Sequence, residues 1–495
     1  MASARRYNER RDDTMPAFRL DRLTATEIAL LRAAAAAAGP ARGAALVGGA
    51  VRDACLGRGA RHAADLDVAV ASGAVDVARD VAGRVGGTFV ALDDERGAAR
   101  VVVGGARLDV ADFRAPSLEA DLAARDFTVD ALAVPLAPLL ASGRAPIVDP
   151  TGGLGDLRAR RLRVPSARVL GDDPLRALRG VRLEAALGLR ATAATRRAIR
   201  AAAPGLARVS PERVRDELVL LLALADTAAA LRRADGLGLL VVLLPEAAAM
   251  RATRQPPPHR FGVLEHSLRA VAGADVVVAR AGALAPLGEE LAAHLAAPLG
   301  GGLTRGHTLK LAALLHDVSK PETRRPVRGR IRFFEHDVLG ARRARAFGER
   351  WRLPGRVVDS LERLVRHHLR PMHLAAAGTL TPRARYRFYR DLGPDTRDLL
   401  LLALVDAAAV RGESPLALWP RAALIRDLLR GFETQRAAAA APPLVRGEEV
   451  MARFGLAPGP EVGRLLRRAR EAQDLGAVRT REEALAYLDS PRDDS

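Results

Sequence analysis

The chain has 495 residues, enough for three or four domains with buried cores, and its formal net charge of +19 favours a polyanionic partner. Its single cysteine, Cys55, excludes intramolecular disulfides and multi-cysteine zinc sites and is consistent with a reducing, cytoplasmic location. No apolar run reaches the roughly 18 residues that a membrane-spanning helix needs, so no membrane partner is expected. Residues 1–22 contain arginines but no apolar core, which predicts a flexible tail and not a secretory signal.

A glycine turn between a strand and a helix is the first candidate binding feature. Residues 44–47 are predicted to form a short buried strand, Gly48 and Gly49 the turn, and residues 50–56 the start of a helix. Such a turn presents backbone N–H groups to a bound phosphate, and Arg52 adds a fixed positive charge. A Gly-Gly pair before a helix is by itself more often a packing turn than a phosphate site.

Two carboxylates follow at Asp65 and Asp67. The alternating pattern of residues 65–70 predicts a strand, on which these two side chains share one face with apolar residues behind them. Two carboxylates held so close repel each other unless a cation lies between them. Hard oxygen ligands favour Mg2+, which commonly keeps open positions for substrate phosphates. An isolated Asp-x-Asp is weak evidence, but its succession to a glycine turn is far more specific.

This succession resembles the head-domain signature of the bacterial tRNA nucleotidyltransferase (CCA-adding enzyme) and poly(A) polymerase family, in the polymerase-beta-type nucleotidyltransferase superfamily. Three stretches carry the resemblance: Gly48-Gly49-Ala50-Val51-Arg52-Asp53, Leu56-Gly57-Arg58 and Asp65-Leu66-Asp67. It implies an α+β fold in which a nucleotidyltransferase head with a mixed sheet precedes all-α domains. In such a head, Gly49 and Arg52 would hold the triphosphate, and Asp65 and Asp67 would bind the Mg2+ that supports nucleotidyl transfer.

A third acid is expected beside this pair. Gly104-Gly105 is predicted to be a two-residue hairpin turn between strands at residues 101–103 and 107–110. The second strand carries Asp109, which would be either a third metal ligand and catalytic residue or, with equal weight, a solvated strand aspartate.

Residues 124–131, Ala-Arg-Asp-Phe-Thr-Val-Asp-Ala, resemble the second motif of the family, which is usually Arg-Arg-Asp-Phe-Thr-x-Asn-Ala. Ala124 stands where the first arginine is expected, and Asp130 stands where asparagine is expected. The resemblance implies that Arg125 and Asp126 hold the ribose and the triphosphate.

A run of regularly spaced charges follows Pro174, which predicts the start of a helix. Asp173, Arg176, Arg179 and Arg182 recur every third residue and would form a ridge on one helix face. A solvated face with internal ion pairs is the purely structural alternative. In the family, the matching aspartate and arginines read the incoming base. Cytosine and adenine both present an amine donor beside a ring-nitrogen acceptor, whereas uracil and guanine present the opposite pattern and would leave buried charges unpaired.

A second set of candidate ligands lies in the Ala/Leu-rich helical region after the prolines at 256–258. His266, the adjacent pair His316-Asp317 and the late Asp406 follow in an order that resembles the HD phosphohydrolase domain. The resemblance implies that they bind a divalent metal of unknown identity, which makes a bound water acidic enough to attack a phosphate.

The HD resemblance also implies a second metal, with Asp317 as a bridge between the two ions. His336 and His367 are the candidate further ligands, although His368 and His373 lie nearby in the chain. His259, His294 and His307 are interpreted as ordinary residues, because a lone histidine on an apolar helix usually belongs to the core.

The motifs divide the chain into a tail (1–22), a nucleotidyltransferase head (23–160), a helical neck with the base-reading helix (161–255), an HD domain (256–412) and a C-terminal helical segment (413–495). The last segment is a candidate tRNA-binding tail, with a solvated basic helix as an equal alternative. The expected function is template-independent addition of C and A from CTP and ATP to the 3' end of tRNA. The HD domain is expected to be a phosphohydrolase.

Alternatives of three classes stay open. Poly(A) polymerase and specialised CC-adding or A-adding enzymes share the head motifs. A phosphohydrolase whose head only binds RNA belongs to a different class. A noncatalytic RNA-binding protein is disfavoured because candidate metal ligands are present in both halves of the chain, and the sequence does not specify the oligomeric state.

Overall fold

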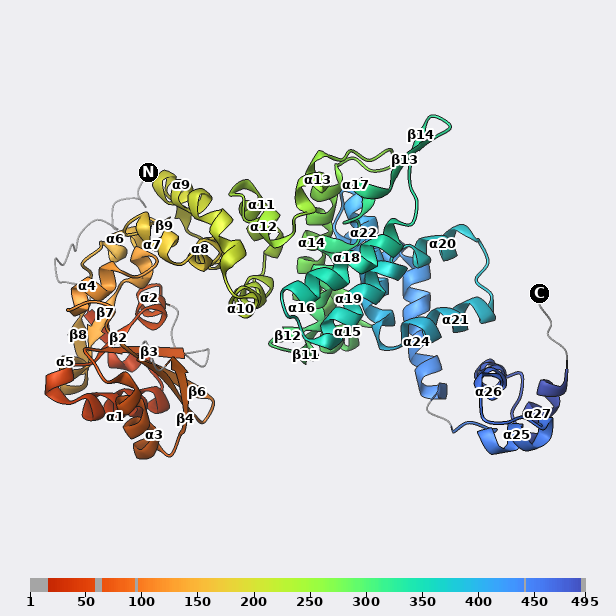
Figure 1. The fold of residues 1–495 in the computed structure, drawn as a ribbon, viewed down its shortest axis with the longest axis horizontal. Coiled ribbons are helices and arrows are strands. Elements are labelled where there is room, and N and C mark those ends of the chain that lie inside the picture. Colours follow the sequence, from red (N-terminus) through yellow and green to blue (C-terminus); the bar gives the residue numbers. More distant parts are fainter. Residues whose placement is uncertain (1–16, 58–64, 94–96, 440–441, 491–495) are drawn as a thin grey trace, which may run out of the picture. The chain divides into compact units, whose positions relative to one another are not determined.

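The computed structural model describes residues 17–57, 65–93, 97–439 and 442–490, so Arg58 of the first motif and residues 1–16 of the expected tail lie outside the described residues. The chain forms two compact units (Figure 1). The first unit comprises Met1–Val209 with Gly236–Val242, and the second comprises Ser210–Asp235 with Leu243–Ser495. The neck expected at residues 161–255 is therefore divided between the two units.

A six-stranded mixed sheet in the order β4-β5-β6-β3-β2-β7 organises the first unit. Its strands are β2 (Ala45–Val47), β3 (Asp65–Val70), β4 (Thr88–Asp93), β5 (Ala98–Val103), β6 (Ala106–Asp112) and β7 (Ala133–Pro135). β3 and β6 are parallel, and the other neighbours are antiparallel. The helices α1 (Ala25–Arg42) and α3 (Ala74–Val85) pack on the sheet.

Local sequence explains two features of this sheet. In β3, Leu66 and Val68 are fully buried while Asp65 is exposed, which is the alternation of a strand with one apolar face. Gly104 and Gly105 have φ angles of +55° and +82°, so the two-residue turn predicted between β5 and β6 is confirmed.

The expected tail is too long. Ala17–Arg19 form β1, which pairs antiparallel with β8 (Arg144–Pro146), and a short 3-10 helix follows at Leu20–Arg22. Phe18 is only 3% exposed. The prediction that residues 17–22 are flexible was therefore wrong, because the burial of Phe18 ties this segment to the first unit.

The rest of the first unit is largely helical. Its further elements are α2 (Gly49–Cys55), α4 (Leu118–Ala123), α5 (Leu136–Ser142), α6 (Gly153–Arg158), β9 (Arg161–Leu162), α7 (Arg168–Asp172), α8 (Leu175–Leu187), β10 (Arg190–Ala191) and α9 (Ala193–Ala202). The short helices α11 (Thr227–Gly236) and α12 (Leu240–Leu243) lie at the boundary of the two units in sequence.

The second unit is a helical bundle with two short hairpins. Its elements are α10 (Pro211–Leu222), α13 (Ala247–Ala252), α14 (Val263–Arg280), α15 (Gly288–Ala296), β11 (Pro298–Gly300), β12 (Leu303–Thr304), α16 (Arg305–Leu315), α17 (Lys320–Thr323), β13 (Arg324–Val327), β14 (Arg330–Phe333), α18 (His336–Arg350), α19 (Gly355–His367), α20 (Arg370–Ala376), α21 (Pro382–Leu392), α22 (Thr396–Arg411), α23 (Pro415–Leu418), α24 (Ala423–Ala439), α25 (Gly447–Phe454), α26 (Pro460–Asp474) and α27 (Arg481–Asp489). Within the described residues, no helix is long and apolar enough to cross a membrane.

The centre of this bundle is formed by α14, α16, α19 and α22, which pack against one another. The helix α24 also packs on α22, so the bundle continues beyond the HD boundary expected at residue 412. The last three helices enclose a smaller core of their own, which includes Val450, Leu465 and Leu488.

Candidate functional sites

Strand pairing in the first unit brings the three predicted acids to one region of the sheet. Asp67 lies opposite Val47 of β2 on one side and opposite Asp109 of β6 on the other. Asp65 is exposed, with its carboxylate 3.6 Å from Arg107, whereas Asp67 is half-buried. The two carboxylates of β3 share a face because they are two residues apart on a strand.

The surroundings of the Asp67 carboxyl disfavour its ionised form. Burial, together with the charges of Asp109 and Asp65, raises the pKa of the Asp67 carboxyl from 3.8 to about 6, and Arg125 and Arg179 offset this only in part. A carboxylate that resists ionisation beside other acids is stabilised by a cation between them. The donor set consists of carboxylate oxygens, which fits a hard divalent ion.

Asp109 is not a solvated strand aspartate, which was the alternative to a metal ligand. Its two oxygens accept hydrogen bonds from Arg100, from Nε at 2.7 Å and from Nη2 at 2.8 Å. It therefore contributes negative charge beside Asp67, while its own oxygens are already bound by a guanidinium.

The glycine turn lies directly against the acids. Gly48 has φ +72°, and a Cβ atom there would lie 3.3 Å from Oδ2 of Asp67 and 3.5 Å from Nη1 of Arg125. A side chain would crowd both groups and strain the backbone, so glycine is required at this position. The predicted juxtaposition of turn and carboxylate strand is present in the structure.

Arg52 is placed differently from the expected triphosphate clamp. Its guanidinium pairs with Asp130 at 2.5 Å and with Asp53 at 2.8 Å, and only 12% of its side chain is exposed. Asp130 is the residue that replaces the asparagine of the second motif. The departure from the family pattern thus supplies a buried counter-charge for Arg52, and a free positive charge for a phosphate is not available in this arrangement.

The second motif meets the charged helix. The buried Asp126 accepts a hydrogen bond from the backbone N–H of Phe127 at 3.0 Å and pairs with Nε of Arg179 at 2.9 Å. Burial acts to raise the pKa of Asp126, but the charges of Arg179 and Arg176 keep it below its ordinary value. Arg125 is held by Asp121 at 3.1 Å, with 15% of its side chain exposed.

Asp173, predicted to be the first residue of the charged ridge, lies before the helix and not on it. α8 starts at Leu175, with Pro174 as its N-cap, and Asp173 is extended and precedes the helix. The Asp173 carboxylate accepts from the N–H of Leu175 at 3.3 Å and lies 3.8 Å from Nε of Arg176.

The arginines of α8 are only partly the solvated face of the structural alternative. Arg176 donates to the carbonyls of Ala124 and Val169 at 3.4 Å and 3.3 Å, and Arg179 binds Asp126. Arg182 is half-buried and lies further along the helix. At least Arg176 and Arg179 are therefore directed toward the second motif.

One arginine near this site was missed. Arg114 follows β6, its backbone N–H donates to Asp121 at 3.0 Å, and loss of solvation together with the charges of Arg125 and Arg176 lowers the pKa of its guanidinium. It adds a further cation beside Asp121 and Asp126. No sequence motif marks this position, so only the tertiary contact identifies it.

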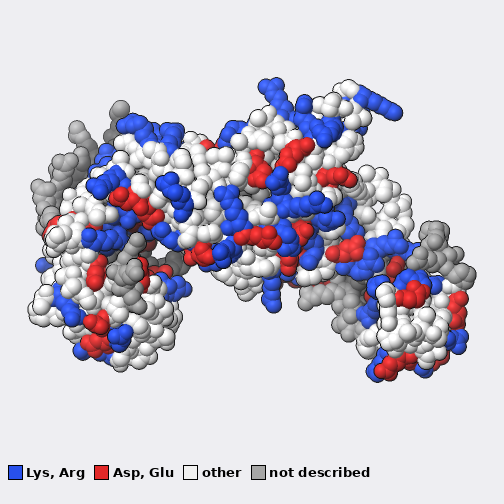
Figure 2. Space-filling model, viewed as in Figure 1, with Lys and Arg blue, Asp and Glu red and all other residues white. Residues whose placement is uncertain are grey.

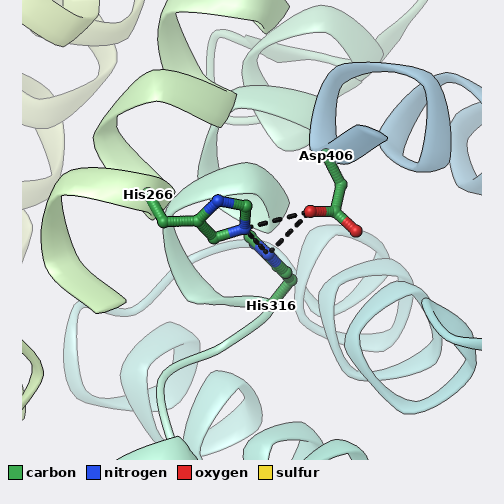
Figure 3. A group of neighbouring side chains, drawn as sticks. All are labelled: His266, His316 and Asp406. Carbon is green, nitrogen blue, oxygen red and sulfur yellow. Dashed lines mark hydrogen bonds and ion pairs between the residues drawn. The ribbon is translucent and has the colours of Figure 1, made fainter. Parts of the chain in front are cut away.

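Two sets of three side chains lie close enough to hold a metal ion, and within the described residues both are in the second unit. His266 of α14, His316 after α16 and Asp406 of α22 form the first set (Figure 3). Nε2 of His266 lies 3.0 Å from Oδ1 of Asp406 and 3.2 Å from Nε2 of His316. These three predicted ligands are far apart in the sequence, and the fold brings them together at the centre of the bundle.

Asp317, His336 and His368 form the second set. Oδ2 of Asp317 lies 3.3 Å from Nε2 of His316, whereas Oδ1 lies 3.6 Å from His336 and 3.8 Å from His368. Asp317 therefore faces both sets, as predicted for a bridging ligand. The choice of His367 was wrong: neighbouring side chains at the end of α19 point in different directions, and it is His368 that is buried in the cluster.

The histidine rings are oriented by the backbone. Nδ1 of His316, His336 and His368 donates to the carbonyl three residues earlier, at 2.9, 2.9 and 2.6 Å respectively. This fixes the tautomer and leaves each Nε2 available to a metal. The donor set of imidazole nitrogens and carboxylates fits a divalent transition metal.

Two residues at this centre had no predicted role. His259, interpreted as ordinary, has its ring 5.1 Å from that of His266. Lys320 lies 2.7 Å from Oδ2 of Asp317. By contrast, His294 pairs with Asp398 at 2.9 Å and His307 caps α16, so both have the structural roles expected of them.

Family models match along the chain. The model described as "Poly A polymerase head domain" matches residues 44–163, "Probable RNA and SrmB- binding site of polymerase A" matches residues 188–250, and "HD domain" matches residues 263–410. An A-adding tRNA nucleotidyltransferase of Deinococcus radiodurans is 40% identical over 420 residues, which cover 83% of this chain and 88% of that protein. A CC-adding tRNA nucleotidyltransferase of Thermus thermophilus is 39% identical over 448 residues, which cover 88% of this chain and 91% of that protein.

Solved structures share the fold. A CCA-adding enzyme in complex with ATP matches with a TM-score of 0.64 at 19% identity, covering 96% of this chain and 99% of that chain. A Thermotoga maritima CCA-adding enzyme in complex with tRNA matches with a TM-score of 0.59 at 19% identity and the same coverage. The chain, which joins a poly(A) polymerase-type head to an HD domain, belongs to the family of bacterial tRNA nucleotidyltransferases.

Proposed function

We propose that the first unit adds C and A nucleotides from CTP and ATP to the 3' end of tRNA without a nucleic-acid template. The observation that carries this proposal is the position of the Asp67 carboxylate against the glycine turn, in a setting where burial and the charges of Asp109 and Asp65 raise its pKa to about 6. Mg2+ held by Asp65 and Asp67, the proposed catalytic pair, would activate the RNA 3'-hydroxyl and stabilise the charge on the leaving pyrophosphate. Asp109 completes the acidic set by its charge.

The other residues bind and orient the nucleotide in this proposal. Gly49 offers its backbone to the triphosphate, and Arg52, tied to Asp130, keeps that turn in place. Arg125 and Asp126 hold the ribose side. Asp173, Arg176, Arg179 and Arg182 read the base, and the last three helices of the chain are proposed to bind the tRNA body.

Metal dependence should vary with pH. With a pKa of about 6, only about a quarter of Asp67 is ionised at pH 5.5, whereas nearly all of it is ionised at pH 7.5. Protons therefore compete with the metal on the acid side, and we expect the Mg2+ concentration for half-maximal incorporation to be about fourfold higher at pH 5.5. Steady-state incorporation at several Mg2+ concentrations measures this. An identical half-saturating concentration at both pH values would contradict it.

Asp173→Ala should relax base selection. The change removes the proposed acceptor for the exocyclic amine of C and A, and we expect incorporation of UTP and GTP relative to CTP and ATP to rise about tenfold. Incorporation ratios for the four nucleotides on one tRNA measure the effect. Asp172→Ala is the matched control, because Asp172 is the preceding residue and its side chain is 64% exposed. Equal ratios in wild type and Asp173→Ala would make the ridge a purely structural element.

A second candidate function is addition of only part of the triplet. It is favoured by the names of the two relatives above, one A-adding and one CC-adding. Incubating the chain with a tRNA that lacks its 3' end, with CTP and ATP separately and together, decides the matter. Full addition needs both nucleotides, a CC-adding enzyme stops after two cytidines, an A-adding enzyme needs a tRNA that already ends in CC, and a poly(A) polymerase produces long A tracts from ATP alone.

We also propose that the metal centre of the second unit hydrolyses phosphate esters. The paired ligand sets that share Asp317, and the nearby cation of Lys320, support this activity. If the head only bound RNA, Asp65→Ala would leave nucleotide incorporation unchanged, and the phosphohydrolase would be the sole activity.

A further inference from the structure

The hairpin β13–β14 is a concentrated basic element. It joins α17 to α18, and its exposed arginines are Arg324, Arg325, Arg328, Arg330 and Arg332. No acidic residue occurs between Glu322 and Glu335. In Figure 2, blue side chains gather where Figure 1 places this hairpin.

The arrangement of these arginines is unfavourable for the hairpin itself. Arg325 lies directly opposite Arg332, and Arg330, opposite Val327, is on the same face. Like charges directly opposite each other destabilise a strand pair. Among the described residues, none of the five arginines has an acid within ion-pair distance. Such uncompensated repulsion indicates that the hairpin is adapted to an anionic partner.

An exposed aromatic residue accompanies the charges. Phe334 follows β14 directly and is 56% exposed, two positions after the exposed Arg332. Basic side chains beside exposed aromatic rings are the combination that binds single-stranded nucleic acid, since the former hold the phosphates and the latter stack on bases.

The base of the hairpin is part of the metal centre. The carbonyl of Phe333, the last residue of β14, accepts the hydrogen bond from Nδ1 of His336 at 2.9 Å. The Lys320 ammonium lies 5.5 Å from the centroid of the Phe333 ring and 2.7 Å from Oδ2 of Asp317. Because His336 of the second set follows Phe333 by three positions, an RNA strand bound along the hairpin would end near these ligands.

We propose that β13–β14 is an arm that binds the phosphates of a single-stranded RNA and holds that RNA at the metal centre of the second unit. The substrate of this centre is then a phosphate ester at an RNA end. Binding by the arm stands on the hairpin alone, whereas the identity of the substrate rests on the phosphohydrolase activity proposed above.

Binding is tested with the triple variant Arg325→Gln, Arg330→Gln and Arg332→Gln in the full chain. The probe is a fluorescein-labelled single-stranded RNA of about 12 nucleotides that ends in a 3'-phosphate, followed by anisotropy at several salt concentrations. We expect the Kd to rise at least about tenfold and the slope of log K against log salt to fall by about 2, since each lost phosphate contact contributes about 0.7. The control triple Arg280→Gln, Arg342→Gln and Arg356→Gln removes the same charge from exposed helical positions and should change the Kd less than threefold. An equal loss of RNA affinity in both triple variants, or no loss in either, would contradict the proposal that the hairpin is an RNA-binding arm.

Assays of phosphate-ester hydrolysis and of nucleotide incorporation show which of the two sites the arm serves. The KM for hydrolysis of the 3'-phosphorylated RNA should rise with the Kd, while hydrolysis of p-nitrophenyl phosphate and nucleotide incorporation into tRNA stay unchanged. If the KM for tRNA in incorporation rises by the same factor, the arm serves the head, and its assignment to the metal centre is wrong. If neither ester is hydrolysed by the wild type, the phosphohydrolase proposal fails, and the anisotropy result still decides whether the arm binds RNA.

Discussion

Asp67→Asn is expected to lower nucleotide incorporation by about a thousandfold, which corresponds to about 4 kcal/mol of transition-state stabilisation. The amide has nearly the same shape, but it has no negative charge to hold a cation in place. Asp67 lies at the point where β2, β3 and β6 meet, beside the Gly48 turn. Asp109, which lies opposite Asp67 on β6, does not offer a free oxygen in the same way, because both of its oxygens are bound by Arg100.

The same substitution should not destabilise the protein. Asp67 has a pKa of about 6 in the folded chain against 3.8 for the free side chain, so the folded state binds the extra proton between these values and loses stability as pH rises through them. At pH 7 the ionised carboxylate is therefore unfavourable in the absence of metal. Asp67→Asn removes that cost, and its Tm in EDTA should equal or exceed that of the wild type.

Incorporation into a tRNA lacking its 3' end and differential scanning calorimetry measure the two effects. Asp76→Asn is the control, because Asp76 is an acid of the same unit whose side chain is 70% exposed. Incorporation within about threefold of wild type in Asp67→Asn would show that the metal is held elsewhere. A loss of activity accompanied by a lower Tm would indicate a folding defect.

Local patterns predicted the central part of the head well. The alternation in β3 and the paired glycines before β6 act over a few residues, so strand faces and turns follow from the chain itself. The partner of Arg52 did not follow in this way. Asp130 is 78 residues away, and its substitution for asparagine in the second motif gained meaning only when the fold placed it against a buried guanidinium.

The metal centre shows the same division. The order of His266, His316-Asp317 and Asp406 predicted which residues the structure brings together, with Asp317 facing both sets. The sequence could not distinguish His367 from His368, because consecutive residues at a helix end differ only in the direction of their side chains. The role of His259 depends on a loop that folds back against α14, a contact for which a single sequence contains no periodic signal.

On the proposal that each ligand set of the second unit binds one ion, Asp317→Asn is expected to reduce the metal content from two ions per chain to less than one. One oxygen of Asp317 faces His316 and the other faces His336 and His368, so the substitution removes the anionic charge shared by both sets. It also leaves the Lys320 ammonium, with a side chain 8% exposed, without its carboxylate, which should lower the free energy of unfolding by about 3 kcal/mol. Mn2+ content after gel filtration, measured by plasma mass spectrometry, and urea unfolding test these two expectations.

A matched pair of neighbouring histidines gives this experiment its control. His368→Ala should remove one of the two ions, because its Nε2 lies 3.3 Å from that of His336 at the second set. His367→Ala should keep both, because His367 is half-buried and belongs to neither set. Nucleotide incorporation should stay at the wild-type level in all three variants if the head binds its own metal. The opposite result for the two histidines would place His367 in the centre after all, and loss of incorporation in Asp317→Asn would mean that the two metal sites do not act independently.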